Sequence, residues 1–383
     1  MRESRTLRLP PPQGGVDLLI VAGEHSGDEH GARLLAGLLR RSPGVRACAL
    51  GGPRLAAAGA QLLLDRTTVS VVGLGEVIRN AGYFRAVIEE VVRWIGQHRP
   101  RVVCFVDNSG VNLRIAARLR EEGISRKGGG TVRAAYYISP QIWASRAGRR
   151  FDMARNLDAL AVIFPFEVDC YADTGLEVSF VGHPFLAPDY RPPVSYDPAG
   201  PVLLLPGSRP KAVGLIFPAL KAGYEAFAKL GWERGAVILY PSEAIRARIE
   251  MAGVHAGTSL RPRGDPVAAS AVLTSSGTMS MHCALAGIPG AIVYKTDPLT
   301  YLIAKWIVRV PYIGIANILL GEPMYPEFIQ DASKPHALAS QLESCTGDPA
   351  RRARTAAQAA ELHSMLASRG GETEADWLAR QLG

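Results

Sequence analysis

Carboxylates follow two apolar runs in the first half of the chain, where they could take part in proton transfer. Asp107 comes directly after VVCFV, and an ionisable group in that position is costly unless it is solvated or paired. Its carboxylate is a candidate general base, with a plain loop cap as the alternative. Glu24 follows VDLLIVAG and is expected to face the same site, although Ser26 or Asp28 could cap the helix that comes next.

The segment ISPQIWASRAGRRFDMARNLD combines an indole with several guanidinium groups. Trp143 and Arg146 are therefore candidates for contact with a phosphate or a sugar. The alternative is a solvated basic helix.

Two turns in the second half are suited to an anion. Arg209 ends the turn PGSR after an apolar run, and its guanidinium could hold a diphosphate through two parallel hydrogen bonds. Ser276, Gly277 and Thr278 lie between the run VLT and a helical stretch, a layout that points backbone N–H groups at an anion. His282 lies one turn into that helix, where an ordinary helix histidine is the alternative to a ligand contact.

Short apolar runs that alternate with helical stretches must hold these groups in place. Strands that are apolar along their whole length are typical of parallel sheets covered by helices on both faces. The predicted fold is α/β, with two doubly wound Rossmann-like domains whose ligand loops, at the carboxyl ends of the strands, face a cleft. The predicted parts are a tail at 1–15, a first domain at 16–187, a linker at 188–200, a second domain at 201–345 and a helical segment at 346–383 that could pack back on the first domain.

The composition indicates a globular protein of the cytoplasm. Hydrophobic residues make up 48% and charged residues 20%, no apolar run is long enough to span a membrane, and the N-terminal stretch lacks the apolar core of a signal peptide. The five cysteines are odd in number and widely spaced, which predicts reduced core thiols. The net charge of +8 favours phosphate or anionic lipid as a partner, whereas no signature of nucleic-acid binding is present.

Short motifs occur in a single order between Val16 and Gln330: VAGEHSGD, LGGPRLAAAG, VVGLGEV, ISPQIWASR, FPFE, FVGHP, LLPGSR, SSGT and YIGIANILLG. Together they resemble the lipid-A-disaccharide synthase family, whose members are GT-B glycosyltransferases. The resemblance implies an inverting transfer of 2,3-diacylglucosamine from its UDP derivative to 2,3-diacylglucosamine 1-phosphate, forming a β-1,6-linked disaccharide and UDP. It implies that the reaction needs no metal or other cofactor. It also implies a peripheral location on the inner face of the cytoplasmic membrane. A homo-oligomer is compatible with the sequence.

The resemblance also implies roles for individual residues. Asp107 would deprotonate or orient the acceptor 6-hydroxyl, and Glu24 would complete the cleft. Trp143 and Arg146 would lie on the side of the lipid phosphate. The residues expected on the donor side are Arg209, Ser276, Gly277, Thr278, His282, Asn317, Glu327 and Gln330.

Three positions depart from the family pattern. His282 replaces the glutamate of SGTAALE that binds the nucleotide ribose, Gly110 replaces the second acid of DAPDFN, and Ala212 replaces the acid expected after GSR. Imidazole can still hydrogen-bond a hydroxyl but carries no fixed negative charge. Two alternatives therefore stay open: a GT-B enzyme that uses another UDP-sugar, and a catalytically silent paralogue that binds lipid or nucleotide.

Residues 71–99 are a candidate for attachment to a membrane, because they combine apolar side chains with arginines. The alternative is a helix stripe that faces the core. The residues concerned are Val71, Val72, Leu74, Val77, Ile78, Arg79, Tyr83, Phe84, Arg85, Arg93, Trp94 and Arg99.

Overall fold

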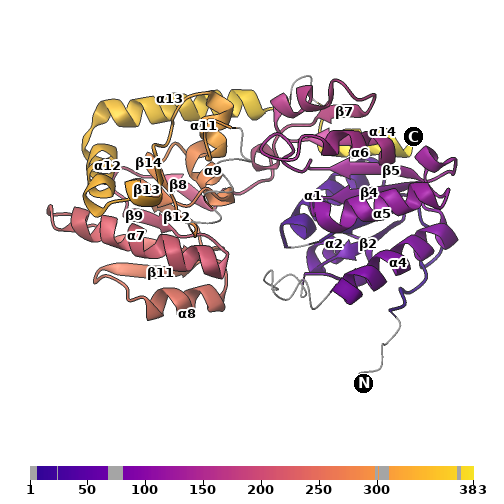
Figure 1. Cartoon of the computed structure of the whole chain (residues 1–383), viewed down its shortest axis with the longest axis horizontal. Helices are drawn as coiled ribbons and strands as arrows, with labels where there is room; N and C mark the ends of the chain where they lie inside the picture. Colours follow the sequence, from indigo (N-terminus) through magenta and orange to yellow (C-terminus); the bar gives the residue numbers. More distant parts are fainter. Residues whose placement is uncertain (1–6, 24, 68–80, 298–300, 302–309, 369–371) are drawn as a thin grey trace. The chain divides into compact units, whose positions relative to one another are not determined.

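The computed structural model describes residues 7–23, 25–67, 81–297, 301, 310–368 and 372–383. The chain divides into two compact units, shown in Figure 1. Unit 1 comprises Met1–Pro184 together with Leu366–Gly383, and unit 2 comprises Phe185–Met365. Each unit has its own parallel sheet flanked by helices, so the α/β prediction is confirmed.

Unit 1 contains a sheet in the order β3-β2-β1-β4-β5-β6-β7, with every neighbouring pair parallel. Its strands are β1 (Leu18–Ala22), β2 (Ala47–Gly51), β3 (Gln61–Asp65), β4 (Val102–Val106), β5 (Arg133–Tyr137), β6 (Ala159–Val162) and β7 (Glu177–Phe180). Its α-helices are α1 (His25–Arg41), α2 (Pro53–Ala57), α4 (Ala81–His98), α5 (Ser109–Glu121), α6 (Arg149–Asn156) and α14 (Glu374–Leu382).

The central strands of this sheet are buried on both faces, as their continuous apolar sequence predicts. Successive side chains of a strand point to opposite faces. Leu19 and Val21 of β1 accordingly pack in a core with residues of α4 and α5, whereas Leu18 and Ile20 pack in a second core with residues of α1 and α14.

The strand order of unit 1 reverses between β1 and β4. Chain progression runs outward from β1 through β2 to β3, and then restarts on the other side of β1 with β4. At such a switch point the loops that follow the two neighbouring strands leave in opposite directions and open a crevice for a ligand. β1 and β4 end together, because Ala22 pairs with Val106, so this position lies beside Asp107.

Unit 2 repeats this plan with a sheet in the order β11-β10-β9-β13-β14-β15, again parallel throughout. The strands are β9 (Val202–Leu205), β10 (Ala236–Tyr240), β11 (Thr258–Pro262), β13 (Ala271–Thr274), β14 (Gly290–Tyr294) and β15 (Glu327–Ile329), and β8 (Val194–Tyr196) pairs separately with β12 (Val267–Ala269). The α-helices are α7 (Pro210–Ala228), α8 (Glu243–Met251), α9 (Thr278–Leu285), α11 (Ile315–Leu320), α12 (Pro335–Gly347) and α13 (Pro349–Leu366). The switch point lies between β9 and β13, which puts the turns after Leu205 and Thr274 side by side.

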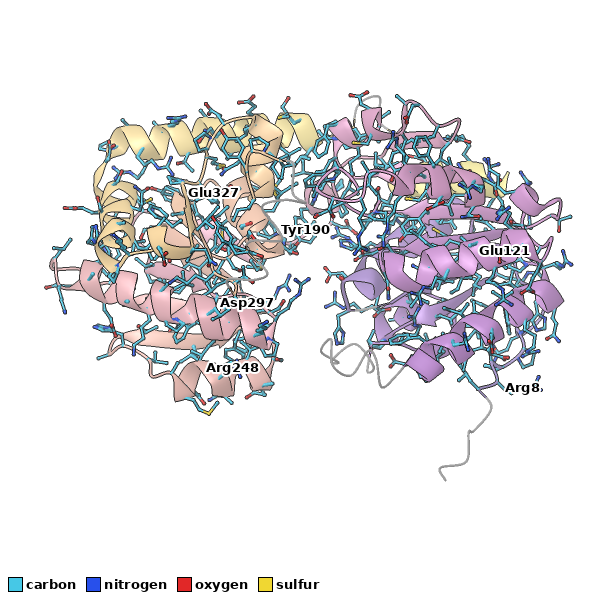
Figure 2. The ribbon with its side chains drawn as sticks, in the orientation of Figure 1. Arg8, Glu121, Tyr190, Arg248, Asp297 and Glu327 are labelled. Atoms are coloured by element: carbon cyan, nitrogen blue, oxygen red, sulfur yellow. The ribbon has the colours of Figure 1, made fainter. Side chains whose placement is uncertain are left out.

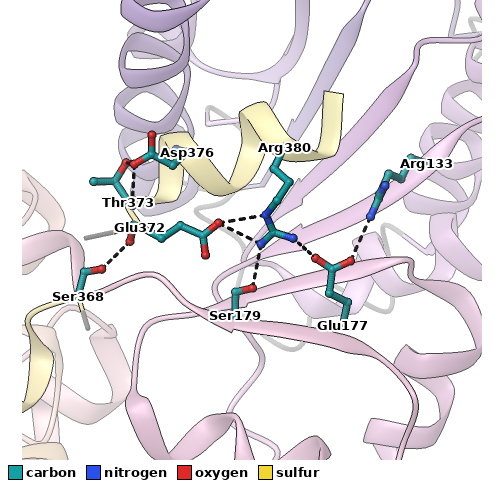
Figure 3. A network of polar contacts seen from close by, with 8 residues as sticks. All are labelled: Arg133, Glu177, Ser179, Ser368, Glu372, Thr373, Asp376 and Arg380. Carbon is teal, nitrogen blue, oxygen red and sulfur yellow. Dashed lines mark hydrogen bonds and ion pairs between the residues drawn. The ribbon is translucent and has the colours of Figure 1, made fainter. Parts of the chain in front are cut away.

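The last helix, α14, packs against α1 of unit 1. Trp377 is fully buried there, which contributes about 2–3 kcal/mol of hydrophobic stabilisation. Arg380 adds a polar network with Glu177, Ser179 and Glu372 (Figure 3). These groups are partly exposed, and such ion pairs contribute less than about 1 kcal/mol each, so burial of the indole dominates the attachment.

The boundaries of the units differ from those expected from composition. Residues 188–200, predicted to be a linker because prolines accumulate there, include β8, which is part of unit 2. Residues 346–383 do not form one segment, since α13 lies in unit 2 up to Met365 while α14 belongs to unit 1. The five cysteines are free thiols, and four of them are buried. No helix in the described ranges combines the length and apolarity needed to cross a membrane.

Candidate active site

Asp107 lies directly after β4 at the switch point of unit 1, as the sequence predicts for the strand end. Its side chain is exposed, and its backbone is in the left-handed region with φ of 49°. That conformation is uncommon for a residue with a side chain and must be held by its surroundings. The fully buried Asn112 donates from Nδ2 to the carbonyl oxygen of Asp107 over 2.9 Å, and the hydroxyl of Tyr136 donates to the same oxygen. These hydrogen bonds fix the main chain of Asp107, while its carboxylate stays exposed to solvent.

Gly23 is required beside this turn. Asn108, with φ of 42°, places its side-chain amide against Gly23, where an added Cβ would lie 1.7 Å from Nδ2. Any side chain at position 23 would displace Asn108 from the crevice. The close approach brings the ends of β1 and β4 into contact at the switch point of unit 1.

Two groups that the sequence analysis did not single out lie close to Asp107. His30 of α1 has its pKa lowered, chiefly because burial disfavours the imidazolium, while the charges of Glu29 and Asp107 act in the opposite direction. Arg149 at the start of α6 donates from Nη1 to Oγ of Ser109 over 3.4 Å. No spacing rule links these residues to Asp107, because they come from different elements that meet only in the folded sheet.

Trp143 and Glu167 are connected by a hydrogen bond in the loop region beyond β5 and β6. The Nε1–H of Trp143 donates to Oε1 of Glu167 over 3.3 Å, and the backbone N–H of Phe164 donates to Oε2 over 3.1 Å. Burial raises the pKa of Glu167 to about 7, although these hydrogen bonds oppose the rise. The indole of Trp143 is therefore held in place by a buried carboxyl group. Arg146 is exposed and has a positive φ of 60°.

Gly207 and Ser275 bring the two turns at the switch point of unit 2 together. Gly207 has φ of 104°, and a Cβ there would lie 3.1 Å from Oγ of Ser275. Arg209 is the N-cap residue of α7 and is exposed. Gly277 caps α9 without a side-chain hydrogen bond, and both Gly277 and Thr278 are exposed, whereas Ser276 is half-buried. A guanidinium group and a helix N-terminus thus share one edge of the sheet, a combination suited to an anion.

His282 does not extend from α9 into solvent but is only 4% exposed. Its ring stacks on Phe185 with centroids 3.9 Å apart, and the hydroxyl of Tyr190 lies 3.1 Å from Nε2. These three residues line part of a cavity of about 230 Å³ in unit 2, together with Tyr196 and His363. The imidazole is consequently one wall of an aromatic pocket.

Asn317, Glu327 and Gln330, which were expected on the donor side, form hydrogen bonds that hold the backbone in place. Asn317 is fully buried and exchanges two hydrogen bonds with the backbone of Tyr325. Glu327, labelled in Figure 2, accepts hydrogen bonds from the backbone of Ile313 and Gly314.

Gln330 uses its amide in the same way, exchanging hydrogen bonds of 3.1 and 2.9 Å with the N–H and carbonyl of Thr296. Because their polar atoms are engaged within the protein, these three side chains shape the loops around β14 and β15.

The positions that depart from the family pattern differ in their surroundings. Ala212 is half-buried and packs against the core of unit 2. Gly110 is exposed at the second position of α5, with open space where a Cβ would lie. Glu24 lies outside the described residues. Within the described part of the chain, no group of three or more histidine, cysteine, aspartate or glutamate side chains is arranged to hold a metal ion.

Comparison with known proteins identifies the family. A family model described as lipid-A-disaccharide synthetase matches residues 18–222 and 246–381. The lipid-A-disaccharide synthase of Geobacter sulfurreducens is 34% identical over 368 residues, which cover 92% of this chain and 94% of that protein. The corresponding synthase of an Anaeromyxobacter species (strain K) is 35% identical over 367 residues, covering 92% and 93%.

Solved structures share the fold at low sequence identity. A calicheamicin glycosyltransferase has a TM-score of 0.57 at 17% identity, with 96% of this chain and 98% of that chain covered. A putative UDP-N-acetylglucosamine 2-epimerase from Listeria monocytogenes has a TM-score of 0.60 at 10% identity, covering 95% of both chains. The Acinetobacter baumannii protein MurG has a TM-score of 0.52 at 13% identity, covering 95% and 99%. This chain belongs to the lipid-A-disaccharide synthase family and has the GT-B fold of glycosyltransferases.

Proposed function

We propose that this chain transfers 2,3-diacylglucosamine from UDP-2,3-diacylglucosamine to 2,3-diacylglucosamine 1-phosphate, forming the β-1,6-linked disaccharide and UDP. The observation that carries the proposal is the match along almost the whole chain to relatives named lipid-A-disaccharide synthase. The arrangement at the two switch points supports it, because each unit presents polar groups at the edge where doubly wound sheets bind ligands.

Unit 2 is proposed to hold the donor. Arg209 would bind the diphosphate of UDP, and the turn formed by Ser276, Gly277 and Thr278 would offer backbone N–H groups to the same anion. Asn317, Glu327 and Gln330 would act by positioning the loops around β14 and β15. Charge stabilisation of the departing diphosphate is what these groups contribute to the reaction.

Unit 1 is proposed to hold the acceptor. Asp107 presents its carboxylate at the switch point and would either take the proton of the acceptor 6-hydroxyl or orient that hydroxyl. The oxygen of the acceptor 6-hydroxyl would then attack the anomeric carbon of the donor on the face opposite the diphosphate, which inverts the configuration at that carbon. Trp143 and Arg146 would contact the acceptor. Glu24, which lies outside the described residues, is a further candidate for the catalytic step.

A different sugar donor is the second candidate function, and His282 favours it. The family's glutamate at this position binds the ribose, whereas His282 forms part of an aromatic pocket with Phe185 and Tyr190. A pocket of that kind would accept a differently shaped donor. Gly110 favours the remaining alternative, a catalytically silent paralogue, because it replaces an acidic residue that the family pattern has at this position.

One assay separates these functions. Purified protein is incubated with UDP-2,3-diacylglucosamine and 2,3-diacylglucosamine 1-phosphate, and the disaccharide is measured by mass spectrometry. Product supports the proposed function. UDP release only from other UDP-sugars supports the second candidate, while nucleotide or lipid binding without any turnover indicates a silent paralogue. If the protein is a silent paralogue, Gly110→Asp should introduce measurable turnover, because there is open space for the new side chain.

We further propose reversible attachment to anionic membranes, with the N-terminal part of α4 as the contact. Tyr83 is 36% exposed at the start of this helix, and Arg85 is exposed beside it. Trp94, by contrast, is 1% exposed and donates to the carbonyl of Pro10, so its predicted part in membrane contact is wrong. Val71, Val72, Leu74, Val77, Ile78 and Arg79 lie outside the described residues.

A liposome assay tests the attachment. Tyr83→Ser should reduce co-sedimentation with acidic liposomes at low salt, since it removes an aromatic anchor without opening the core. Phe84→Ser is a less specific probe, because Phe84 packs partly against the core of unit 1. Recovery in the supernatant that is equal for acidic and neutral liposomes would contradict the proposal.

A further inference from the structure

His30 stands out among the histidines because it lies at the switch point of unit 1 and forms no hydrogen bond within the described part of the chain. It is half-buried on α1, and its Nδ1 is buried with no partner among the described residues. Nε2 is not buried to the same degree, and it makes no hydrogen bond to the described part of the chain. A buried polar atom that the fold leaves unsatisfied is costly and calls for an explanation.

The helix face that carries His30 is directed at the end of β4. Gly27 lies three residues earlier on the same face of α1, and a Cβ at Gly27 would lie 3.6 Å from the carbonyl oxygen of Val106 and 3.5 Å from Cβ of Ala22. Val106 is the residue before Asp107, so the first turns of α1 cover the ends of β1 and β4. His30 and Asp107 are consequently neighbours across the switch point, and their charges interact.

We propose that His30 is the catalytic base of the transfer reaction, and that Asp107 stabilises the imidazolium formed when His30 takes the proton of the acceptor hydroxyl. This inference rests on the proposed function and assigns the proton acceptor within it. It also offers a reason why the chain tolerates Gly110, since the second acid of the family motif is not needed if an imidazole is present.

The bonds and charges balance in one displacement. The acceptor O–H bond breaks and its proton moves to a ring nitrogen of His30. The acceptor oxygen bonds to the anomeric carbon of the donor while the bond between that carbon and the diphosphate oxygen breaks, so UDP leaves with the electron pair. The imidazolium then returns its proton to water.

The surroundings of His30 favour the neutral imidazole before the reaction and the cation during it. Burial lowers the pKa of His30, so the ring is a free base near neutral pH. The charged neighbours are Glu29 and Arg33 on α1 and Asp107 after β4, with Arg149 of α6 next to the Asp107 turn. The two carboxylates favour the imidazolium and Arg33 opposes it.

Substitution of His30 tests the proposal against a matched control. His30→Gln should lower kcat by about 100-fold or more, the usual contribution of a general base, with the KM for the donor and the melting temperature nearly unchanged. His25→Gln changes an exposed histidine on the same helix and should keep the rate within twofold. Wild-type rates in His30→Gln would overturn the proposal.

A chemical rescue separates catalysis from a structural role. His30→Ala should regain activity on addition of imidazole, and the regained rate should follow the concentration of neutral imidazole as pH is varied. A residue that only supports the fold would show no such dependence. Loss of activity in His30→Ala without rescue, at any imidazole concentration or pH, would overturn the proposal.

A third measurement does not depend on the identity of the substrates. The C–H resonances of His30, assigned by comparison with His30→Gln, are titrated by NMR in the wild type and in Asp107→Asn. Removal of the carboxylate charge should lower the pKa of His30. An unaltered titration would refute the pairing of His30 with Asp107 even if the wild type makes the disaccharide. A wild type that shows the pairing but makes no disaccharide would refute the proposed function, and with it the role of His30 in that transfer.

Discussion

Glu167→Gln should remove a pH dependence of stability that one buried carboxyl group creates in unit 1. Glu167 is only 1% exposed, and burial raises its pKa from an ordinary value of 4.5 to about 7. The folded state therefore binds the proton more tightly than the unfolded state does. The stabilisation is fully present below pH 4.5, decreases as pH rises through the interval from 4.5 to 7, and is lost above it.

The size of the effect follows from the two pKa values. At about 1.4 kcal/mol per pH unit, the difference between 4.5 and about 7 corresponds to about 3 kcal/mol. Glutamine stays neutral throughout, but its amide NH₂ must face one of two donors, the indole of Trp143 or the N–H of Phe164, at a cost of about 1–3 kcal/mol. Glu167→Gln is thus expected to be less stable than wild type at pH 5 and to approach or exceed it at pH 8.

The stability of unit 1 at each pH can be measured by hydrogen exchange in urea, followed by mass spectrometry on peptides of β1 and β4. This method reports unit 1 separately from unit 2. The quantity to compare is the unfolding free energy of the variant minus that of wild type, which should rise by about 2.5 kcal/mol between pH 5 and pH 8. Glu89→Gln, at an exposed site of the same unit, should give a flat difference. A flat difference for Glu167→Gln as well would refute the assignment of the buried charge.

Three further changes probe the two switch points. Asp107→Asn should leave the melting temperature unchanged and reduce turnover by about 100-fold or more in a UDP-release assay, with the exposed Asp169→Asn as control. Asn112→Leu leaves the carbonyls of Val21 and Val106 without this donor and should destabilise unit 1 by about 2–3 kcal/mol in the exchange experiment; full stability would show that the amide is dispensable. Gly207→Ala should weaken UDP binding in calorimetry and destabilise unit 2 by about 1–3 kcal/mol, because φ is 104° and Ser275 lies close, whereas Gly347→Ala has open space and should change neither.

The sequence located the strands and the polar residues that follow them, but not what those residues contact. VVCFV was recognisable as a strand because it is apolar throughout, and Asp107 was recognisable as its polar end. His30 was not, since its significance arises only when α1 lies across the ends of β1 and β4. Likewise, SSGTMSMH predicted a donor-side position for His282, but only the fold places Phe185 against its ring. Residue types along one element are readable from periodicity, whereas contacts between distant elements are not.

Backbone strain is distributed differently at the two switch points, and the difference agrees with the ligand that each is proposed to bind. In unit 1 the residues with positive φ after β4 and β5 carry side chains, namely Asp107, Asn108 and Ile138, each at a cost of about 1–3 kcal/mol. The hydrogen bonds from Asn112 and Tyr136 offset part of that cost. Because strained residues cluster at functional sites, this arrangement supports the role proposed for Asp107. In unit 2 the turn after β9 uses Gly207, which adopts positive φ without strain. A glycine would suffice there if, as proposed, backbone N–H groups and one arginine bind a diphosphate, whereas the proton transfer proposed for unit 1 needs a side chain.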